Sequence, residues 1–327
     1  MRLTLVRHGE STWNAAGTWQ GQSDAPLSPR GQLQARALAG RMYETHFDVH
    51  VCSDLARARD TAAPLGLPMR PDARWREIDV GRWAGVPRVD VAARFPEELA
   101  ALRRGDPVRI GGGESMREFE ARVDAALLAL AAEDAEEALV VTHGGVIRAL
   151  ATRALGLRGR ESPLVGVSNT SLTGLEIRDG AITLLRYNDA VHLDPADRDG
   201  SGSRAVVVGC EFEPTERRVV DGLLAGLGIA LYYASPAVLD SPLAEQLVAD
   251  PLNDDDGVLA LAHLQHAHPD EAFAVLLSPA EAGRAVGAAL DLPCPDGLGP
   301  LAHAAVAQIR RREEGPLLHS WNVPLGV

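Results

Sequence analysis

The stretch LVRHGESTWN, residues 5–14, places an arginine, a histidine and a glycine directly after a short apolar run. The opening residues MRLTLV favour a β-strand, so Arg7 and His8 stand at its carboxyl end. Ligands of α/β proteins bind outside the carboxyl ends of parallel strands. An isolated Arg-His-Gly is more often a solvated strand end, so the rest of the chain has to decide whether this one belongs to a site.

An apolar strand followed by a helix recurs along the first half of the chain. Residues 48–53 (DVHVCS) and 137–145 (EALVVTHGG) are strand-like, and a helical pattern follows each of them. Ser28 in LSPRG is a helix N-cap signal, and Ser115 with Glu118 forms a capping box. Alternating strands and helices predict an α/β fold with a mainly parallel sheet flanked by helices.

The composition is that of a globular protein. The chain has 327 residues, 46% of them hydrophobic and 24% charged, with a formal net charge of −13. This acidic balance disfavours nucleic acid and anionic membranes as partners, so a bound phosphate needs a local cluster of cations. No apolar run approaches about 20 residues and no signal-like segment is evident, so a cytoplasmic location is expected. Cys52, Cys210 and Cys294 lack metal-ligand or redox spacing.

The length suggests two domains, at about 150 residues for each. The polar stretch DPADRDGSGSR predicts a linker over 194–204 between a first domain of 1–193 and a second of 205–327. The second half repeats the apolar pattern of the first, since the segment beginning at Glu137 aligns with the one beginning at Glu271. We therefore expect a smaller, degenerate α/β copy of the first domain. Chance similarity of Ala/Leu-rich helices is the alternative.

The repeat changes the residues at the strand ends. Ser278 stands where the first half has His143, and Cys210 falls near the position of His8 but has no arginine beside it to activate a thiol. The second copy is therefore expected to be inactive. Its apolar stretches, such as LYYASP, need covering, and a homodimer through the C-terminal domain is one way to cover them.

Five ionisable groups of the first half stand at a strand end or in an adjoining turn or loop: Arg7, His8, Arg57, Glu77 and His143. They lie in four motifs, in the order LVRHGESTWN, SDLARARDTA, REIDVGRWAG and VVTHGG. These motifs resemble the histidine phosphatase superfamily, also called phosphoglycerate mutase-like, over residues 1 to about 193. The resemblance implies that the five groups are catalytic, that no cofactor or metal is needed, and that four further residues bind substrate: Asn14, Gln20, Gly21 and Gly144.

The chemistry of phosphoryl transfer agrees with these residue types. Arginine forks bind phosphate oxygens in pairs, the role expected of Arg7 and Arg57. Neighbouring guanidinium groups disfavour an imidazolium, so His8 is the expected nucleophile and a phosphohistidine the expected intermediate. His143 would stabilise the equatorial oxygens of the transition state. Glu77 would protonate the leaving alkoxide and later accept a proton from water.

We predict a metal-independent phosphatase, a phosphoric monoester hydrolase of the histidine acid phosphatase type, acting on a small phosphorylated metabolite. Phosphoglycerate-mutase-type phosphoryl transfer is the first alternative, although the short stretch between Glu77 and His143 lacks an obvious lid. A phospholigand-binding scaffold or sensor is the second alternative. Asp79 is a weaker rival for the acid. Three arginines either meet a second acidic group of the substrate or lie on the surface: Arg103, Arg104 and Arg109.

A metal site in the second half is not expected. Three histidines lie close together there, but no carboxylate is in register with them: His263, His266 and His268.

Overall fold

The computed structural model describes residues 1–104, 106–157 and 164–193, and further along the chain 204–209, 231–234, 250–251, 261, 264, 273–293, 298, 305–312 and 315–324. The chain divides into two compact units. One comprises Met1–Ala151 with Val167–Gly180, and the other comprises Thr152–Gly166 with Ala181–Val327. Apart from Arg204, the predicted linker over 194–204 lies outside the described residues, so the domain boundaries stay a prediction.

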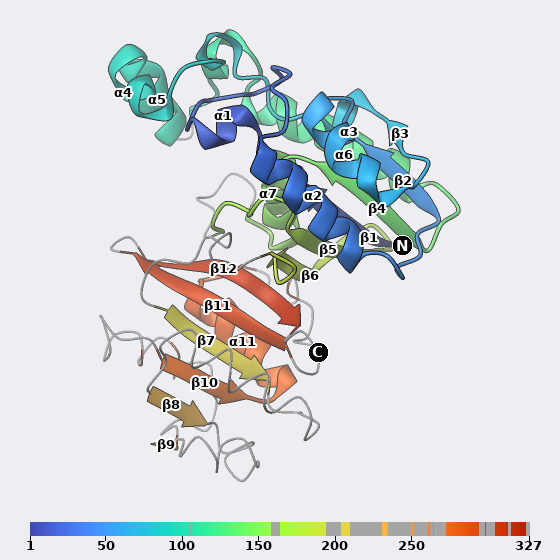
Figure 1. Cartoon of the computed structure of the whole chain (residues 1–327). Helices are drawn as coiled ribbons and strands as arrows, with labels where there is room; N and C mark the ends of the chain where they lie inside the picture. Colours follow the sequence, from blue (N-terminus) through green and yellow to red (C-terminus); the bar gives the residue numbers. More distant parts are fainter. Residues whose placement is uncertain are drawn as a thin grey trace. The chain divides into compact units, whose positions relative to one another are not determined.

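The first unit is built on a sheet in the order β3-β2-β4-β1-β5 (Figure 1). Its strands are β1 (Arg2–Arg7), β2 (Val49–Cys52), β3 (Arg70–Pro71), β4 (Glu137–Thr142) and β5 (Leu172–Arg178). The first four run parallel and β5 is antiparallel to β1, which confirms the predicted fold class. Arg7 pairs with Thr142 at the ends of β1 and β4, so the residues that follow these strands emerge side by side.

Helices connect the strands, and those beginning at residues 29, 56, 116 and 144 are the ones that the sequence predicts. The helices are α1 (Thr12–Ala15), α2 (Pro29–Arg41), α3 (Ala56–Ala62), α4 (Arg88–Arg94), α5 (Pro96–Arg103), α6 (Met116–Ala131) and α7 (Gly144–Ala154), with 3-10 turns η1 (Ala63–Leu65), η2 (Ala73–Trp75), η3 (Gly81–Trp83) and η4 (Ile110–Gly112). The Ser28 hydroxyl accepts the Gly31 N–H at the start of α2, and Ser115 and Glu118 close the predicted capping box of α6. None of the described helices is long and apolar enough to cross a membrane.

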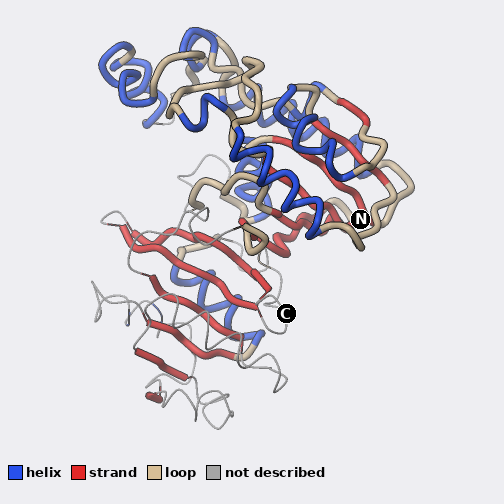
Figure 2. The backbone as a smooth tube through the Cα atoms, viewed as in Figure 1, coloured by secondary structure: helices blue, strands red, loops and turns tan. Residues whose placement is uncertain are grey.

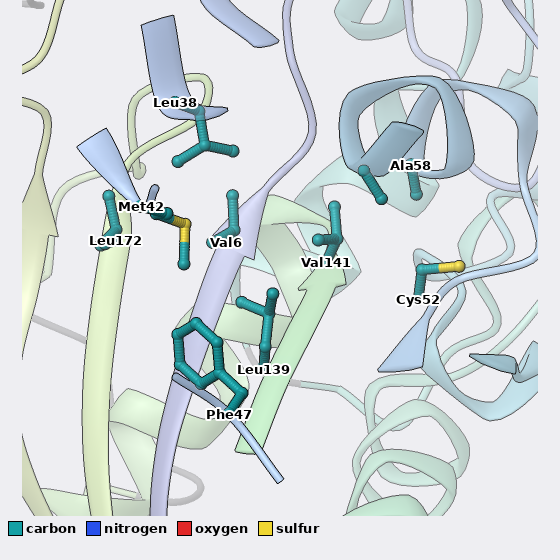
Figure 3. Packing of buried hydrophobic residues seen from close by; sticks show 10 residues of the cluster. Val6, Leu38, Met42, Phe47, Cys52, Ala58, Leu139, Val141 and Leu172 are labelled. Carbon is teal, nitrogen blue, oxygen red and sulfur yellow. The ribbon is translucent and has the colours of Figure 1, made fainter. Parts of the chain in front are cut away.

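An apolar cluster covers one face of this sheet (Figure 3). Val6, Leu139 and Val141 project from β1 and β4 and meet Leu38 of α2 and Ala58 of α3. Burying a side chain of this size contributes about 1.5–3 kcal/mol. The side chains of Leu5 and Val140 point to the opposite face of the sheet, because successive residues of a strand alternate between faces. Both have an exposed fraction of 0%, so this second face is covered as well. The strand ends that carry polar groups are therefore held on a rigid, doubly covered sheet.

Cys52 belongs to the same cluster. It is a free cysteine, and burial raises the pKa of its thiol. A buried thiol of this kind packs as a small apolar side chain. Cys210 and Cys294 lie outside the described residues.

The second unit contains a sheet in the order β6-β12-β11-β7-β10-β8-β9. Its described strands are β6 (Ala181–Asp189), β7 (Arg204–Gly209), β8 (Leu231–Ala234), β9 (Asp250–Pro251), β10 (Phe273–Leu277), β11 (Ala305–Arg312) and β12 (Gly315–Pro324). Figure 2 shows these strands in red, with helix α11 (Pro279–Ala289) in blue beside them. Strands β7 to β10 are paired in parallel, and β11 is antiparallel to both β7 and β12.

The order β9-β8-β10-β7-β11 of the second unit repeats the order β3-β2-β4-β1-β5 of the first, with the same strand directions. In this correspondence Gly209, paired with Leu277, takes the place of Arg7, paired with Thr142. Ser278 follows β10 as His143 follows β4. The described strands thus have the order that the sequence repeat predicts.

Candidate active site

The ends of β1 and β4 bring two histidines together. His8 directly follows β1, and its backbone N–H donates to the carbonyl of Thr142 at 2.9 Å. The ring centroids of His8 and His143 are 5.1 Å apart. Their exposed fractions are only 3% and 0%, so both imidazoles lie in a desolvated site.

Two hydrogen bonds determine which nitrogen of His8 carries the proton. Nδ1 lies 2.7 Å from the carbonyl oxygen of Gly9, and a carbonyl can only accept, so Nδ1 is the protonated nitrogen. Nε2 lies 3.2 Å from Nε of Arg57, whose N–H can only donate. Burial, followed by the charges of Arg57 and Arg7, holds the pKa of His8 well below its ordinary value. His8 is therefore a neutral imidazole with its lone pair on Nε2.

Arg57 is delivered from α3 and is buried. Its Nη1 donates to the carbonyl of Ser23 at 2.7 Å and its Nη2 to the carbonyl of Gly21 at 2.8 Å. Burial lowers the pKa of Arg57 to about 10, so the guanidinium stays charged at neutral pH. The sequence predicts Gly21 as a backbone donor to substrate, whereas the contact seen here is its carbonyl accepting from Arg57.

Arg7 and His143 each have a buried nitrogen without a partner among the described residues. Arg7 donates from Nη1 to the carbonyl of Val167 at 2.6 Å, which leaves Nε unbonded. His143 places Nε2 2.8 Å from the hydroxyl of Ser53, which leaves Nδ1 unbonded. Buried polar atoms nearly always have a hydrogen-bond partner, so two such atoms at adjoining strand ends indicate a place where an acceptor binds.

The charges of these groups suit an anion. Burial lowers the pKa of Arg7 to about 10, so it too remains charged at neutral pH. Burial, followed by the charge of Arg57, holds the pKa of His143 well below its ordinary value. The site thus combines two cations with two neutral imidazoles.

The carboxylate of Glu77 lies at the N-terminus of α7. Oε2 accepts the Gly145 N–H at 3.0 Å and Oε1 accepts the Ile78 N–H at 2.9 Å. A Cβ on residue 145 would lie 2.1 Å from Oε1, so glycine is what lets the carboxylate reach the helix. Asp79, the predicted rival, instead accepts the Gly81 N–H at 2.9 Å in its own turn. The charge of Glu77 also raises the pKa of Arg7 and Arg57 against the effect of burial.

Two of the remaining predicted binding residues, Asn14 and Gln20, contact Ser11. Asn14 Oδ1 accepts the Ser11 N–H at 3.2 Å, and Gln20 Oε1 accepts the Ser11 hydroxyl at 2.8 Å. Both amide nitrogens are then the groups left to donate to a ligand. Gly144 begins α7, and a Cβ there would approach Arg7 Nε no closer than 3.5 Å, an ordinary contact.

Other polar candidates do not join the site. Arg104 pairs with Asp106 at 2.7 Å, and Arg109 pairs with Glu118, so both arginines are engaged by neighbouring acids. The described residues contain no group of three or more His, Cys, Asp or Glu side chains suited to a metal ion. Four predicted positions lie outside what the structure describes: the side chain of Arg103, and His263, His266 and His268.

Sequence reasoning missed several supporting residues. Ser53 follows β2 as His143 follows β4. The expectation that ligands bind at the carboxyl ends of parallel strands, which we call the strand-end rule, therefore applies to Ser53 as well. The Thr61 hydroxyl accepts the Gly9 N–H at 2.8 Å and donates to the Arg57 carbonyl at 2.6 Å, one helical turn after Arg57. Arg122 contacts mainly backbone carbonyls, and no spacing in the sequence points to it.

Comparison with known proteins identifies the family to which the chain belongs. The family model of the histidine phosphatase superfamily (branch 1) matches residues 3–190. A metal-independent phosphoserine phosphatase of Arabidopsis thaliana is 35% identical over 202 residues, covering 58% of this chain and 82% of the relative. A Yersinia pestis protein named "Probable phosphoglycerate mutase" is 32% identical over 208 residues, covering 59% of this chain and 95% of the relative.

A solved structure agrees with the family match. Mycobacterial glucosyl-3-phosphoglycerate phosphatase, determined with VO3, is 33% identical and has a TM-score of 0.52, covering 57% of this chain and 98% of its own. The family model spans more than half of the chain, so the chain belongs to the histidine phosphatase superfamily. The family match ends at residue 190, before β7 begins.

Proposed function

We propose that this chain is a metal-independent phosphatase that hydrolyses a small phosphomonoester through a phosphohistidine on Nε2 of His8. The observation that carries the proposal is the state of His8, a neutral imidazole with its lone pair on Nε2, set between Arg7 and Arg57. The phosphatases among the relatives support the reaction class.

In the first step the Nε2 lone pair of His8 attacks phosphorus, and the bond from phosphorus to the leaving oxygen breaks. That oxygen takes a proton from Glu77 and departs as an alcohol. Arg57 must swing its Nε–H from His8 Nε2 to a phosphate oxygen, a change that bound substrate favours because the oxygen is charged. Arg7 Nε and His143 Nδ1 are placed to donate to the other oxygens.

In the second step a water molecule attacks the phosphohistidine. Glu77, now a carboxylate, accepts a proton from the water as the water oxygen bonds to phosphorus. The N–P bond breaks, its electron pair returns to Nε2 of His8, and inorganic phosphate leaves. Ser53 assists by donating its hydroxyl to Nε2 of His143, which leaves the hydrogen of that ring on Nδ1. Two guanidinium groups supply the positive charge that a metal ion supplies in other phosphatases.

We further propose the histidine acid phosphatase type. Because burial and two cations hold the pKa of His8 well below its ordinary value of 6.5, the nucleophile stays neutral in mildly acidic solution. The kcat/KM for an aryl phosphate is therefore expected to persist below pH 6.5. A steep fall through pH 6.5 that tracks protonation of one group would contradict this part of the proposal.

For the second unit we propose an inactive copy of the first domain. The support is the repeated strand order, with Gly209 at the position of Arg7. Ser278, at the position of His143, accepts the Glu281 N–H in a capping box at the start of α11, so its hydroxyl serves the helix.

Turnover assays test the proposal. We expect the chain to release inorganic phosphate from 4-nitrophenyl phosphate, with activity retained in EDTA and abolished in His8→Ala. Cys210→Ala is the matched control in the second unit and should keep full activity. Activity in His8→Ala, or loss in EDTA restored by a divalent ion, would overturn it. A mutase, the function named for the Yersinia pestis relative, would instead return the phosphoryl group to another oxygen of the substrate rather than to water.

A further inference from the structure

The loop that carries Glu77 is fastened to α6 by one side chain. Arg122 donates from Nη1 to the carbonyls of Arg74 and Arg76, both at 2.9 Å, and from Nη2 to the carbonyl of Glu77 at 3.1 Å. A guanidinium offers five N–H donors in a fixed plane, so it can hold several carbonyls at once in a way that an ammonium cannot. The backbone from Arg74 to Glu77 is thereby attached to helix α6 (Met116–Ala131).

Glu114 completes this attachment. Its carboxylate accepts from Arg122 Nε at 2.8 Å and Nη2 at 2.7 Å, and it also accepts the Asp79 N–H at 2.9 Å. Burial alone would raise the pKa of Glu114, but the hydrogen bonds from Arg122 and the Asp79 N–H outweigh it and lower the pKa. Glu114 therefore stays ionised, and it holds the loop two residues after Glu77 while Arg122 holds it at Glu77 and before.

Glu77 is thus held at both ends. Its carbonyl accepts from Arg122 Nη2 and also from Gln22 Nε2 at 3.2 Å, and its carboxylate accepts the Gly145 N–H at the start of α7. Arg122 itself contacts neither histidine nor any atom expected to touch phosphate, and its side chain is 20% exposed. Its contribution to the reaction would have to pass through the position of the Glu77 carboxylate.

We propose that Arg122, with Glu114, is a positioning residue for the general acid of this site. The proposal rests on the phosphatase mechanism given above and adds the residues that set where its proton donor stands. A general acid works only within hydrogen-bond reach of the leaving oxygen, and a displacement of about 1 Å can cost about 100-fold in rate. Releasing the loop should therefore weaken protonation of the leaving group and leave nucleophilic attack by His8 intact.

Leaving-group dependence tests this role. For Arg122→Met we expect kcat on an alkyl phosphate such as phosphoserine to fall about 10- to 100-fold, and kcat on 4-nitrophenyl phosphate to fall less than about 3-fold, because nitrophenolate leaves without a proton. In a Glu77→Gln background the same change should cause no further loss on either substrate. Arg122→Lys, which keeps the charge but loses the planar fork, should behave like Arg122→Met in weaker form.

Arg70→Met is the matched control, because the Arg70 guanidinium pairs with Glu133 and not with a carbonyl of the Glu77 loop. It should leave both rates unchanged. Equal losses on the two substrates in folded Arg122→Met or Arg122→Lys, or a further loss on top of Glu77→Gln, would overturn the positioning role. If the wild-type chain turned over neither substrate, the phosphatase proposal itself would fail, and the role of Arg122 with it.

Discussion

The two units of this molecule have the same strand order but different residues where the strands end. In the first unit β1 ends at Arg7, followed by His8, and His143 follows β4; in the second, β7 ends at Gly209 and Ser278 follows β10. This strand order therefore does not require the polar groups that the first unit presents at its strand ends. Function depends on particular side chains rather than on the order of the strands that carry them.

The polar groups at the two sets of strand ends also differ in how they are satisfied. His143 leaves Nδ1 buried without a protein partner among the described residues, whereas Ser278 is bonded within its capping box. Burial also lowers the pKa of Arg7 and Arg57 to about 10, which means that folding works against their charge. Groups kept in such an unfavourable state are typical of functional sites. The strand ends of the first unit therefore carry a cost in stability.

Among the substitutions that test this comparison, the largest change in kcat is expected for Glu77→Gln. For Glu77→Gln we expect kcat on an alkyl phosphate to fall about 100- to 10,000-fold, since an alkoxide needs a proton to leave. Activity on 4-nitrophenyl phosphate should change little. Steady-state rates on both substrates measure this, and equal losses would remove Glu77 from the acid's role.

His143 and Ser278 form a matched pair across the two units. We expect His143→Ala to lower kcat on 4-nitrophenyl phosphate about 100- to 1,000-fold, as loss of one transition-state donor does in other enzymes. Ser278→Ala should lower the stability of α11 by about 0.5–2 kcal/mol through loss of its cap and leave kcat unchanged. A substantial fall in kcat for Ser278→Ala would show that the second unit takes part in the reaction.

Gly145 on α7 and Gly283 on α11 allow the same glycine-to-alanine substitution to be compared in the two units, although they do not occupy corresponding positions. A methyl group at Gly145 would meet Oε1 of Glu77, whereas at Gly283 nothing lies within 4 Å. We expect Gly145→Ala to displace the carboxylate and lower the alkyl phosphate rate about 10- to 100-fold, with the aryl phosphate rate nearly kept. Gly283→Ala should affect neither rate. Wild-type alkyl phosphate turnover in Gly145→Ala would show that the observed carboxylate position is not the working one.

The smallest of these effects concerns stability against pH. Folding holds the pKa of His8 and His143 well below 6.5, so below pH 6.5 the unfolded chain binds more protons than the folded one. The free energy of unfolding should therefore be highest above pH 6.5 and fall on acidification, by about 1.4 kcal/mol per pH unit for each such histidine. Urea unfolding between pH 7 and 5 measures the slope. His143→Asn should reduce this slope by about 1.4 kcal/mol per pH unit, the contribution of one proton. An unchanged slope would mean that His143 is not held neutral.

Much of the first unit could be predicted because its signals are local. Apolar runs gave β1, β2 and β4, and the strand-end rule brought Arg7, His8 and His143 to one edge. Helix starts were predictable where a side chain binds the backbone three residues later, as Ser28 does at α2. Helix α5 begins with Pro96 at its first turn, which is a recognised start signal in the sequence.

Other features depend on contacts that no local pattern encodes. Arg122 holds carbonyls 45 to 48 residues away in sequence, and any residue type can present a carbonyl, so its partners leave no trace in the sequence. The same holds for Gly145, where glycine is needed only because Glu77 arrives from a distant loop. The sequence likewise offers both Glu77 and Asp79 as the acid, and what separates them in the structure is their hydrogen bonds, to the start of α7 and within a turn respectively.

The identity of the phosphorylated atom tests the central claim most directly. The full-length chain would be mixed with a phosphomonoester, quenched within one turnover and digested under alkaline conditions that preserve phosphohistidine, and the modified peptide would be located by mass spectrometry. We expect one phosphoryl group on His8 and none in His8→Ala, and chromatography against standards of the two phosphohistidine isomers should assign it to Nε2. Phosphate on a residue of the second unit, or turnover with no phosphoenzyme in a trap fast enough to catch one, would contradict the account.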